Sequence, residues 1–144
     1  MKWIVLICVA IALVAAAVAI WVRVKPLPVA QYYMTQPMRP AGDYPMEGGF
    51  WAVRPGSQVE LSALDGLILA TPRTVHLAGS VAEGHISYVT RSAFWRFPDV
   101  TNLWLEQGKV NLRSHLVFGR GDLGVNRARI AQWLKAAGMV IPTP

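Results

Sequence analysis

The strongest constraint on this chain is an uninterrupted apolar run from residue 3 to residue 22. The run reads WIVLICVAIALVAAAVAIWV and contains no charged residue, glycine or proline. A helix rises about 1.5 Å per residue, so a run of this length spans about 30 Å, the thickness of the hydrocarbon core of a bilayer. The sequence therefore predicts a single transmembrane helix, and we assign residues 1–24 to a membrane anchor.

Both borders of this run carry side chains that favour the membrane interface. Trp3 and Trp21 lie near its two ends, where indole rings prefer the level of the lipid headgroups. Arg23 and Lys25 follow directly, and Lys2 precedes the run. We interpret Trp3, Trp21, Arg23 and Lys25 as membrane-interface residues and expect the lipid bilayer to be a partner of the chain.

A cleaved secretory signal is the alternative to a retained anchor. Lys2 supplies a minimal basic region, and residues 15–19 supply small side chains for a cleavage site. The apolar region of a typical signal has about 7 to 15 residues, and this run is longer, which favours retention. The numbers of basic residues on the two sides of the apolar run are nearly equal, so the positive-inside rule does not decide the orientation of the helix in the membrane. Because a helix that begins at residue 3 inserts like a signal anchor, we expect a single-pass protein of the bacterial inner membrane with residues 23–144 in the periplasm.

The rest of the chain has room for one domain. The full length is 144 residues, of which 15% are charged, and the formal net charge is +6. This length excludes a large multidomain enzyme, and the low charge content argues against disorder. The basic residues are spread along the sequence, and an anchored domain has little access to chromosomal DNA, so nucleic acid is not an expected partner.

Residues 25–56 are rich in proline, glycine and apolar side chains. Each proline fixes φ and removes a backbone donor, so neither a long helix nor a central strand is expected here. We assign the segment to an extended connector. Its aromatic and methionine content is higher than a free linker needs, so we expect it to pack on the surface of its own domain or on a neighbouring membrane subunit. These side chains are Tyr32, Tyr33, Met34, Met38, Tyr44, Met46, Phe50 and Trp51.

Residues 57–144 predict an α+β domain. Residues 57–60 have the pattern of a capping box, which predicts a helix from about residue 58 to residue 69, although the alternation at its start would also suit a strand. Period-two alternation then predicts roughly four strands, and the break at Gln107-Gly108 is short enough for a tight antiparallel hairpin. Asp122 is a candidate helix cap, and a helical period follows it. We therefore expect a two-layer domain in which helices flank a roughly four-stranded antiparallel sheet.

The densest group of polar residues is GRGDLGVNRAR at residues 119–129, preceded by LRS at residues 112–114. Together with RSAFWRFPDV at residues 91–100, these segments resemble a bacterial and plastid family known as domain of unknown function fourteen-ninety-nine. The resemblance covers roughly residues 50–138. The matching positions are Arg91, Ser92, Phe97, Asp99, Arg113, Ser114, Gly119, Asp122, Gly124, Val125, Asn126, Arg127 and Arg129.

This resemblance implies the fold and an extracytoplasmic, membrane-tethered setting. It implies no reaction, because the family has no assigned activity. The chain also departs from the family pattern. Relatives tend to have a Ser-Arg pair and a Tyr-Ser pair where this chain has Leu116-Val117 and Arg120-Gly121, and the cysteine-containing segment near the start is absent.

The same motif defines the candidate site. It brings together a strand end, a glycine-rich turn and a helix N-terminus, whose free N–H groups and partial positive charge suit an anion. Guanidinium groups bind carboxylate or phosphate through two parallel hydrogen bonds. The alternative is a cluster that pairs internally: Asp122 caps the helix, Asn126 bonds a strand end, and Arg113 or Arg127 pairs with an aspartate, Asp99 or Asp122. The candidate residues are Arg91, Asp99, Arg113, Ser114, Asp122, Asn126, Arg127 and Arg129, with Arg120 beside them.

Signatures of catalysis and of cofactor binding are missing. His76, His85 and His115 are not at metal-ligand spacing, and Ser92 and Ser114 lack an adjacent base. We therefore expect no metal, no cofactor and no enzymatic activity. The leading hypothesis is a non-catalytic accessory subunit that docks on a larger integral membrane complex through its helix and connector, with respiratory and photosynthetic electron-transfer assemblies as candidates. The second hypothesis is an extracytoplasmic binding module for an anionic lipid or small metabolite at the arginine-rich site.

Overall fold

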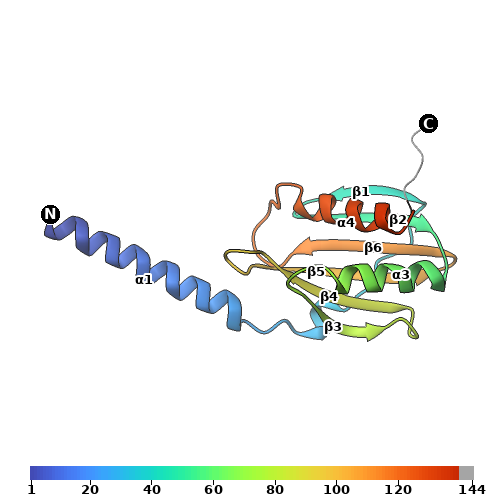
Figure 1. Ribbon diagram of the computed structural model, residues 1–144, viewed down its shortest axis with the longest axis horizontal. Helices are drawn as coiled ribbons and strands as arrows, with labels where there is room; N and C mark the ends of the chain where they lie inside the picture. Colours follow the sequence, from blue (N-terminus) through green and yellow to red (C-terminus); the bar gives the residue numbers. More distant parts are fainter. Residues whose placement is uncertain (140–144) are drawn as a thin grey trace.

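The computed structural model describes residues 1–139, in which a long N-terminal helix leads into an α+β domain (Figure 1). The last residues of the predicted domain, 140–144, lie outside the described residues. The helices are α1 (Lys2–Val24), α2 (Val29–Tyr32), α3 (Gln58–Leu69) and α4 (Val125–Ala136). The strands are β1 (Gly42–Met46), β2 (Gly49–Pro55), β3 (Thr74–Ser80), β4 (His85–Arg91), β5 (Pro98–Glu106) and β6 (Lys109–Leu116).

Helix α1 contains the whole apolar run in its 23 residues. Its most apolar window has a mean hydropathy of 3.0 and is not buried against the rest of the chain. By length and composition, α1 is able to cross a membrane, and a signal sequence near the N-terminus would have the same properties. The predicted apolar helix is therefore present, and both of its possible roles stay open at this point.

The sheet has six antiparallel strands in the order β1-β2-β6-β5-β4-β3. The prediction of roughly four strands identified β3 to β6 but missed β1 and β2, which lie inside the segment 25–56 assigned to the connector. The prolines of that segment are compatible with strands because β1 is an edge strand and Pro55 is the last residue of β2. β2 is buried on both faces, so residues 50–53 are continuously apolar and lack the expected alternation, and Arg54 after them is buried as well.

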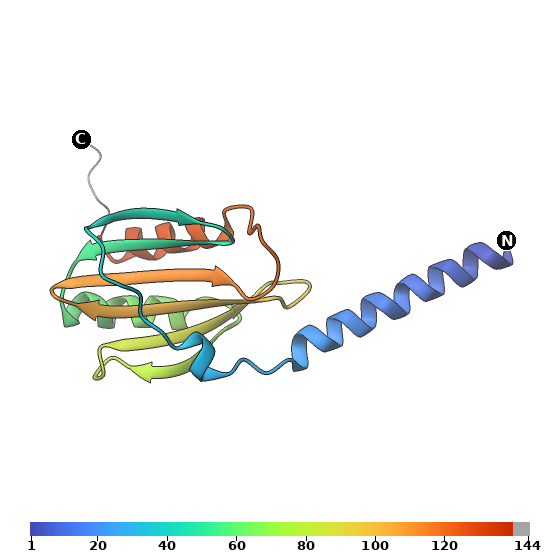
Figure 2. The same cartoon turned by 180° about the vertical axis from the view of Figure 1, so that it is seen from behind.

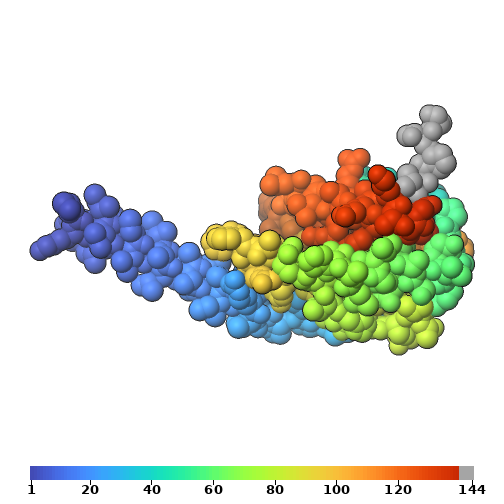
Figure 3. Space-filling view, in the orientation of Figure 1, coloured from blue at the N-terminus to red at the C-terminus, as the bar shows by residue number. Residues whose placement is uncertain are grey.

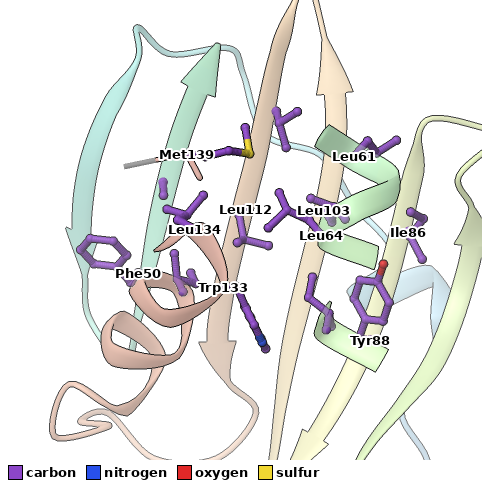
Figure 4. Packing of buried hydrophobic residues seen from close by; sticks show 14 residues of the cluster. Phe50, Leu61, Leu64, Ile86, Tyr88, Leu103, Leu112, Trp133, Leu134 and Met139 are labelled. Atoms are coloured by element: carbon purple, nitrogen blue, oxygen red, sulfur yellow. The ribbon is translucent and has the colours of Figure 1, made fainter. Parts of the chain in front are cut away.

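Helices α3 and α4 cover one face of the sheet, and the main core lies between the two layers (Figure 4). Helix α3 has the predicted bounds because both bonds of the capping box form. The Ser57 hydroxyl accepts from the N–H of Val59 at 3.2 Å, and the Glu60 carboxylate accepts from the N–H of Ser57 at 2.7 Å. The side chains labelled in Figure 4 are Phe50, Leu61, Leu64, Ile86, Tyr88, Leu103, Leu112, Trp133, Leu134 and Met139.

Two turns fix the C-terminal half of the domain. Gln107 and Gly108 have φ angles of 48° and 72°, a left-handed pair that suits the predicted tight hairpin between β5 and β6. Because of a second turn, α4 begins later in the sequence than the predicted cap at Asp122 indicated. Leu123 and Gly124 also have positive φ angles, of 51° and 77°, so the N-cap residue of α4 is Gly124 and not Asp122.

Residues 25–41, the part of the predicted connector that precedes β1, run across the other face of the sheet (Figure 2) and are called the connector from here on. Asn102 of β5, which is fully buried there, donates from Nδ2 to the carbonyl of Tyr32 at 2.9 Å and accepts from the N–H of Met34 at 3.4 Å. The ring of Tyr33 stacks on the ring of His85, with 4.0 Å between their centroids. The connector therefore packs on the sheet of its own domain, the first of the two alternatives that its composition raised.

Candidate functional site

The candidate residues are divided between the two faces of the sheet. Consecutive residues of a strand point to opposite faces, and Arg113 and Ser114 are consecutive in β6. Ser114 lies opposite Thr101 and points toward the helices, whereas Arg113 lies opposite Asn102 and points toward the connector. The single cluster expected from the motif is thus two sites. The network under α4 consists of Asp99, Thr101, Ser114, Asn126 and Arg129. The cationic groove under the connector consists of Arg113 and the residues around it, Arg39, Glu47, His115 and Arg120.

An ion pair between Asp99 and Arg129 is the centre of the network under α4. Nη1 of Arg129 donates to Oδ2 of Asp99 at 3.1 Å and to Oδ1 of Asn126 at 3.2 Å. Burial raises the pKa of Asp99, and the charge and hydrogen bond of Arg129 oppose that rise. The aspartate's partner is Arg129 rather than Arg113 or Arg127. Arg129 lies one turn beyond Asn126 on the same face of α4, which brings both side chains onto β5 and β6.

Hydroxyl and amide groups complete this network. Oγ of Ser114 donates to Oδ1 of Asn126 at 2.5 Å, and the hydroxyls of Ser114 and Thr101 lie 2.9 Å apart. Ser114, Thr101 and Asn126 are fully buried. Nδ2 of Asn126 has no hydrogen-bond partner within residues 1–139. Asn126 therefore joins the first turn of α4 to the ends of β5 and β6.

Asp122 stabilises the same turn from outside the helix. Its Oδ1 accepts from the N–H of Gly124 at 3.0 Å, and its Oδ2 accepts from the N–H of Asn126 at 2.9 Å. Burial disfavours the charged carboxylate, but the hydrogen bonds from Asn126 and Gly124 outweigh it and hold the pKa of Asp122 below its usual value. Two N–H groups at the helix N-terminus are therefore bonded to a side chain of the protein.

Two of the candidate arginines, Arg91 and Arg127, lie apart from this network. Nη1 of Arg91 donates to the carbonyl of Val22 at 3.3 Å and to the carbonyl of Arg96 at 3.0 Å, so Arg91 ties the end of α1 to the domain. The guanidinium of Arg127 lies over the ring of Phe50, 5.7 Å from its centroid. Neither arginine forms an ion pair with a carboxylate in the described part of the chain.

The predicted interface residues at the end of α1 also contact the domain. The rings of Trp21 and Phe118 lie 5.1 Å apart, and Nζ of Lys25 lies 5.0 Å from the first ring and 4.6 Å from the second. Arg23 donates to the carbonyl of Ala19, one turn earlier in α1. Trp3, at the other end of the helix, is 79% exposed. Trp21 and Lys25 therefore lie where the helix meets the domain.

Arg113 is the central residue of the cationic groove. Its Nη1 lies 3.3 Å from Nδ1 of His115, and because arginine has only donors, this contact uses Nδ1 as an acceptor of the neutral ring. Burial, and then the charge of Arg113, lower the pKa of His115 to about 4. Burial also lowers the pKa of Arg113 itself. Neither ion pair within residues 1–139 includes Arg113, so its guanidinium has no carboxylate partner there.

Two hollows adjoin Arg113 and share it as a lining residue. The first has a volume of about 340 Å³, and Arg120 and Glu47 also line it. The second has a volume of about 260 Å³ and is lined by Arg39 from the connector. The Arg39 guanidinium lies 4.8 Å from the ring centroids of both Tyr44 and Trp51, which hold it against β1 and β2. The groove therefore presents three guanidinium groups and one carboxylate.

Sequence reasoning missed Arg39 and His115 as members of this groove. The alternation of β6 contained a signal for His115, which is two residues from Arg113 and must share its face. Arg39 carried no such signal, because its position depends on the path of the connector. No group of three or more His, Cys, Asp or Glu side chains in the described residues is arranged to hold a metal ion.

Comparison with known proteins identifies one family. The model of the family described as protein of unknown function (DUF1499) matches residues 44–136. A search of the curated proteins finds no match to this chain. The matched segment begins within β1 and ends at the last residue of α4, so it contains the network under α4 and Arg113, His115 and Arg120 of the groove.

Proposed function

We propose that this chain, which belongs to the DUF1499 family, is a non-catalytic, membrane-anchored domain that binds a small anionic ligand in the cationic groove. The observation that carries the proposal is the environment of the Arg113 side chain. Its partly buried guanidinium has no carboxylate partner within residues 1–139 and adjoins both hollows. Removing a charge from water without a counter-charge costs free energy, and a bound anion offsets that cost.

The chemistry of the groove favours a carboxylate or a phosphate group. A guanidinium binds either group through two parallel hydrogen bonds, and Arg39 and Arg120 add positive charge on the two sides of Arg113. His115 is neutral at physiological pH, and with Nδ1 occupied as an acceptor its other ring nitrogen carries the proton and is a donor. An anionic lipid headgroup and a free metabolite share this chemistry.

A thermal-shift screen of the full chain in mild detergent tests the proposal. The panel contains inorganic phosphate, glycerol phosphate, and di- and tricarboxylates. A ligand at about 100 times its dissociation constant stabilises the folded state by about 2.7 kcal/mol. We expect at least one anion to raise the melting temperature of the wild type and of Arg127→Gln, whose guanidinium lies outside the groove, but not of Arg113→Gln. The absence of stabilisation across the panel, or equal stabilisation of all three proteins, would contradict the proposal.

A second candidate function is an accessory subunit of a larger integral membrane complex. The exposed apolar surface of α1 favours it, because a helix of this kind is covered by lipid or by other transmembrane helices. Respiratory and photosynthetic electron-transfer assemblies are the candidate complexes. Pull-down from gently solubilised native membranes should then recover a fixed set of membrane proteins in constant proportion. Recovery of the chain alone would argue against this function and leave the anion-binding proposal intact.

Both functions place α1 in the bacterial inner membrane as a retained anchor, with residues 23–144 in the periplasm. The length and apolar composition of α1 support the anchor. Protease treatment of intact spheroplasts tests the orientation, since a periplasmic domain is digested without cell lysis. Protection of the domain until lysis would reverse the orientation. Recovery of a mature chain without α1 would replace the anchor with a cleaved signal.

A further inference from the structure

We propose that the end of the domain where α1 enters lies flat on an anionic lipid surface, with the loops 92–97 and 119–124 dipping into the headgroup region. The inference rests on the membrane anchoring stated above and concerns a surface that borders the cationic groove, with which it shares Glu47, Gly119 and Arg120. It assigns a bilayer, and not a protein, as the occupant of this surface. Three observations support it: the placement of the loops, their exposed apolar side chains and the distribution of charge.

Strand direction gathers these loops at one end of the sheet. β4 leads into residues 92–97 and β6 leads into residues 117–124, and both strands end on the side from which α1 leaves the domain (Figure 1). The space-filling view places the segment around residues 92–97, in yellow, close to the end of α1 (Figure 3). The contacts of Trp21 with Phe118 and of Arg91 with the Val22 carbonyl fix this arrangement.

Three large apolar side chains point away from the protein at this end. Phe94 is 77% exposed, Trp95 is 43% exposed and Leu123 is 100% exposed. The rings of Phe94 and Trp95 contact each other edge to face at 5.0 Å, so they form one aromatic unit on the loop. Aromatic side chains of this kind are typical of the headgroup level of a bilayer, where Trp21 is expected from the position of α1.

The charges at this end complement an anionic surface. Its arginines and lysine are Arg23, Lys25, Arg73, Arg91, Arg96, Arg120 and Arg127. Three carboxylates lie nearby. Asp99 is paired with Arg129, and Asp122 accepts two backbone hydrogen bonds, so Glu47 is the one carboxylate among these three whose charge faces the seven basic residues without such bonds. At the opposite end, Asp43 pairs with Arg54, and the three carboxylates Glu60, Glu83 and Glu106 outnumber Lys109 and Lys135.

The combination of aromatic side chains, basic residues and a membrane helix at one end favours lipid over a protein partner. Basic residues close to a bilayer are attracted to anionic headgroups, and exposed aromatic and leucine side chains bury part of their surface at the acyl boundary. A protein interface of comparable strength would need a larger continuous apolar patch. The exposed apolar residues here are separated by arginines, which suits a lipid surface.

Site-directed fluorescence on the full chain in lipid nanodiscs tests the inference. In a Cys8→Ala background, a single cysteine replaces Phe94 or Leu123 and carries an environment-sensitive dye. Val59, which is 73% exposed at the opposite end of the domain, is the matched control position. In discs of phosphatidylcholine and phosphatidylglycerol, we expect blue-shifted emission and quenching by headgroup-proximal nitroxide lipids at positions 94 and 123, and neither effect at position 59. Removing phosphatidylglycerol should weaken both effects.

Water-like emission at positions 94 and 123, equal to that at position 59, would overturn the inference. If the same positions were shielded only in native membranes, the occupant would be a protein and the lipid assignment would be wrong. A measurement at the native Cys8 shows whether only the lipid-surface inference has failed or whether the membrane anchoring by α1 has failed as well. A dye on Cys8 in the otherwise wild-type chain should be quenched by nitroxides deep in the acyl region, and loss of that signal would instead contradict the membrane anchoring itself. Equal melting temperatures of the labelled variants establish that each one is folded.

Discussion

Arg113 and Ser114 are consecutive residues of β6 whose side chains belong to opposite faces of the sheet and to different sites. Ser114 donates to Asn126 in the largely buried network under α4, whereas the hydrogen bond that Arg113 forms with another side chain of the described residues goes to His115. The first residue therefore contributes to holding the fold together, and the second is available to a ligand. Substitutions on the Ser114 face should therefore change the stability of the fold, and substitution of Arg113 on the other face should change ligand binding.

Arg129→Met should destabilise the protein. The substitution leaves the nearly buried Asp99 carboxylate without its counter-charge, and breaking a buried pair in this way costs about 3 kcal/mol. Denaturant titration of the full chain in detergent measures the loss. The double variant Asp99→Asn with Arg129→Met removes both charges and should lose less than the sum of the two single variants. Strict additivity would show that the pair is not coupled.

Asp122→Ala should lower the free energy of unfolding by about 0.5 to 2 kcal/mol, because the N–H groups of Gly124 and Asn126 lose their acceptor. Asp122→Asn keeps an acceptor oxygen and is the matched control, so it should lose less. Thermal unfolding followed by circular dichroism measures both variants. Identical stability of the wild type and Asp122→Ala would refute this role for Asp122.

Asn102→Leu should loosen the connector while the sheet stays folded. The carbonyl of Tyr32 and the N–H of Met34 lose their buried partner, so residues 29–34 should exchange amide hydrogens faster. Asn111→Leu is the matched control, since Asn111 is equally buried but bonds Trp51 and its own strand. Hydrogen exchange measured by mass spectrometry should show faster exchange of the connector in the first variant only. Unchanged exchange at residues 29–34 would contradict the account of how the connector is held.

The stability of the domain should fall in mild acid because of His115. Its pKa in the folded chain is about 4, below the value of about 6.5 expected for an unfolded chain, so the unfolded state binds a proton first. The contribution is fully present above about pH 6.5 and is lost progressively as the pH falls toward 4. Burial also lowers the pKa of His85, which adds to the same trend.

His115→Gln should therefore flatten the dependence of the unfolding free energy on pH between about 6.5 and 4. His85→Gln should flatten it as well, and the double variant should flatten it most. Urea titrations at a series of pH values measure the slope. A variant His115→Gln with the same slope as the wild type would mean that this ring does not titrate as the structure requires.

Local signals in the sequence were sufficient for several elements. The capping box at Ser57 predicted the start of α3, and Gln107-Gly108 predicted the hairpin between β5 and β6, because each signal depends on neighbours within a few positions. β2 gave no such signal. Its two faces are both covered, one by the helices and one by the packing of Trp51 against Tyr44 and Trp104, so its apolar residues do not alternate with polar ones.

The candidate site required information that neighbouring residues do not carry. The motif at residues 119–129 did not indicate which residues pair with one another, since the distance between Asp99 and Arg129 depends on how α4 packs on β5. The division of Arg113 from Ser114 depended on knowing that β6 is an interior strand with both faces covered. Arg39 belongs to the groove only because the connector folds back over the sheet.

The most direct test of the central claim is isothermal titration of the most stabilising anion of the screen into the full chain in detergent. The wild type and Arg127→Gln should bind it with the same affinity and a stoichiometry of one. Arg113→Gln should bind it at least about tenfold more weakly, the equivalent of about 1.4 kcal/mol, because the central guanidinium is gone. Equal binding by Arg113→Gln would show that the groove is not the site, and the proposed function would then be wrong.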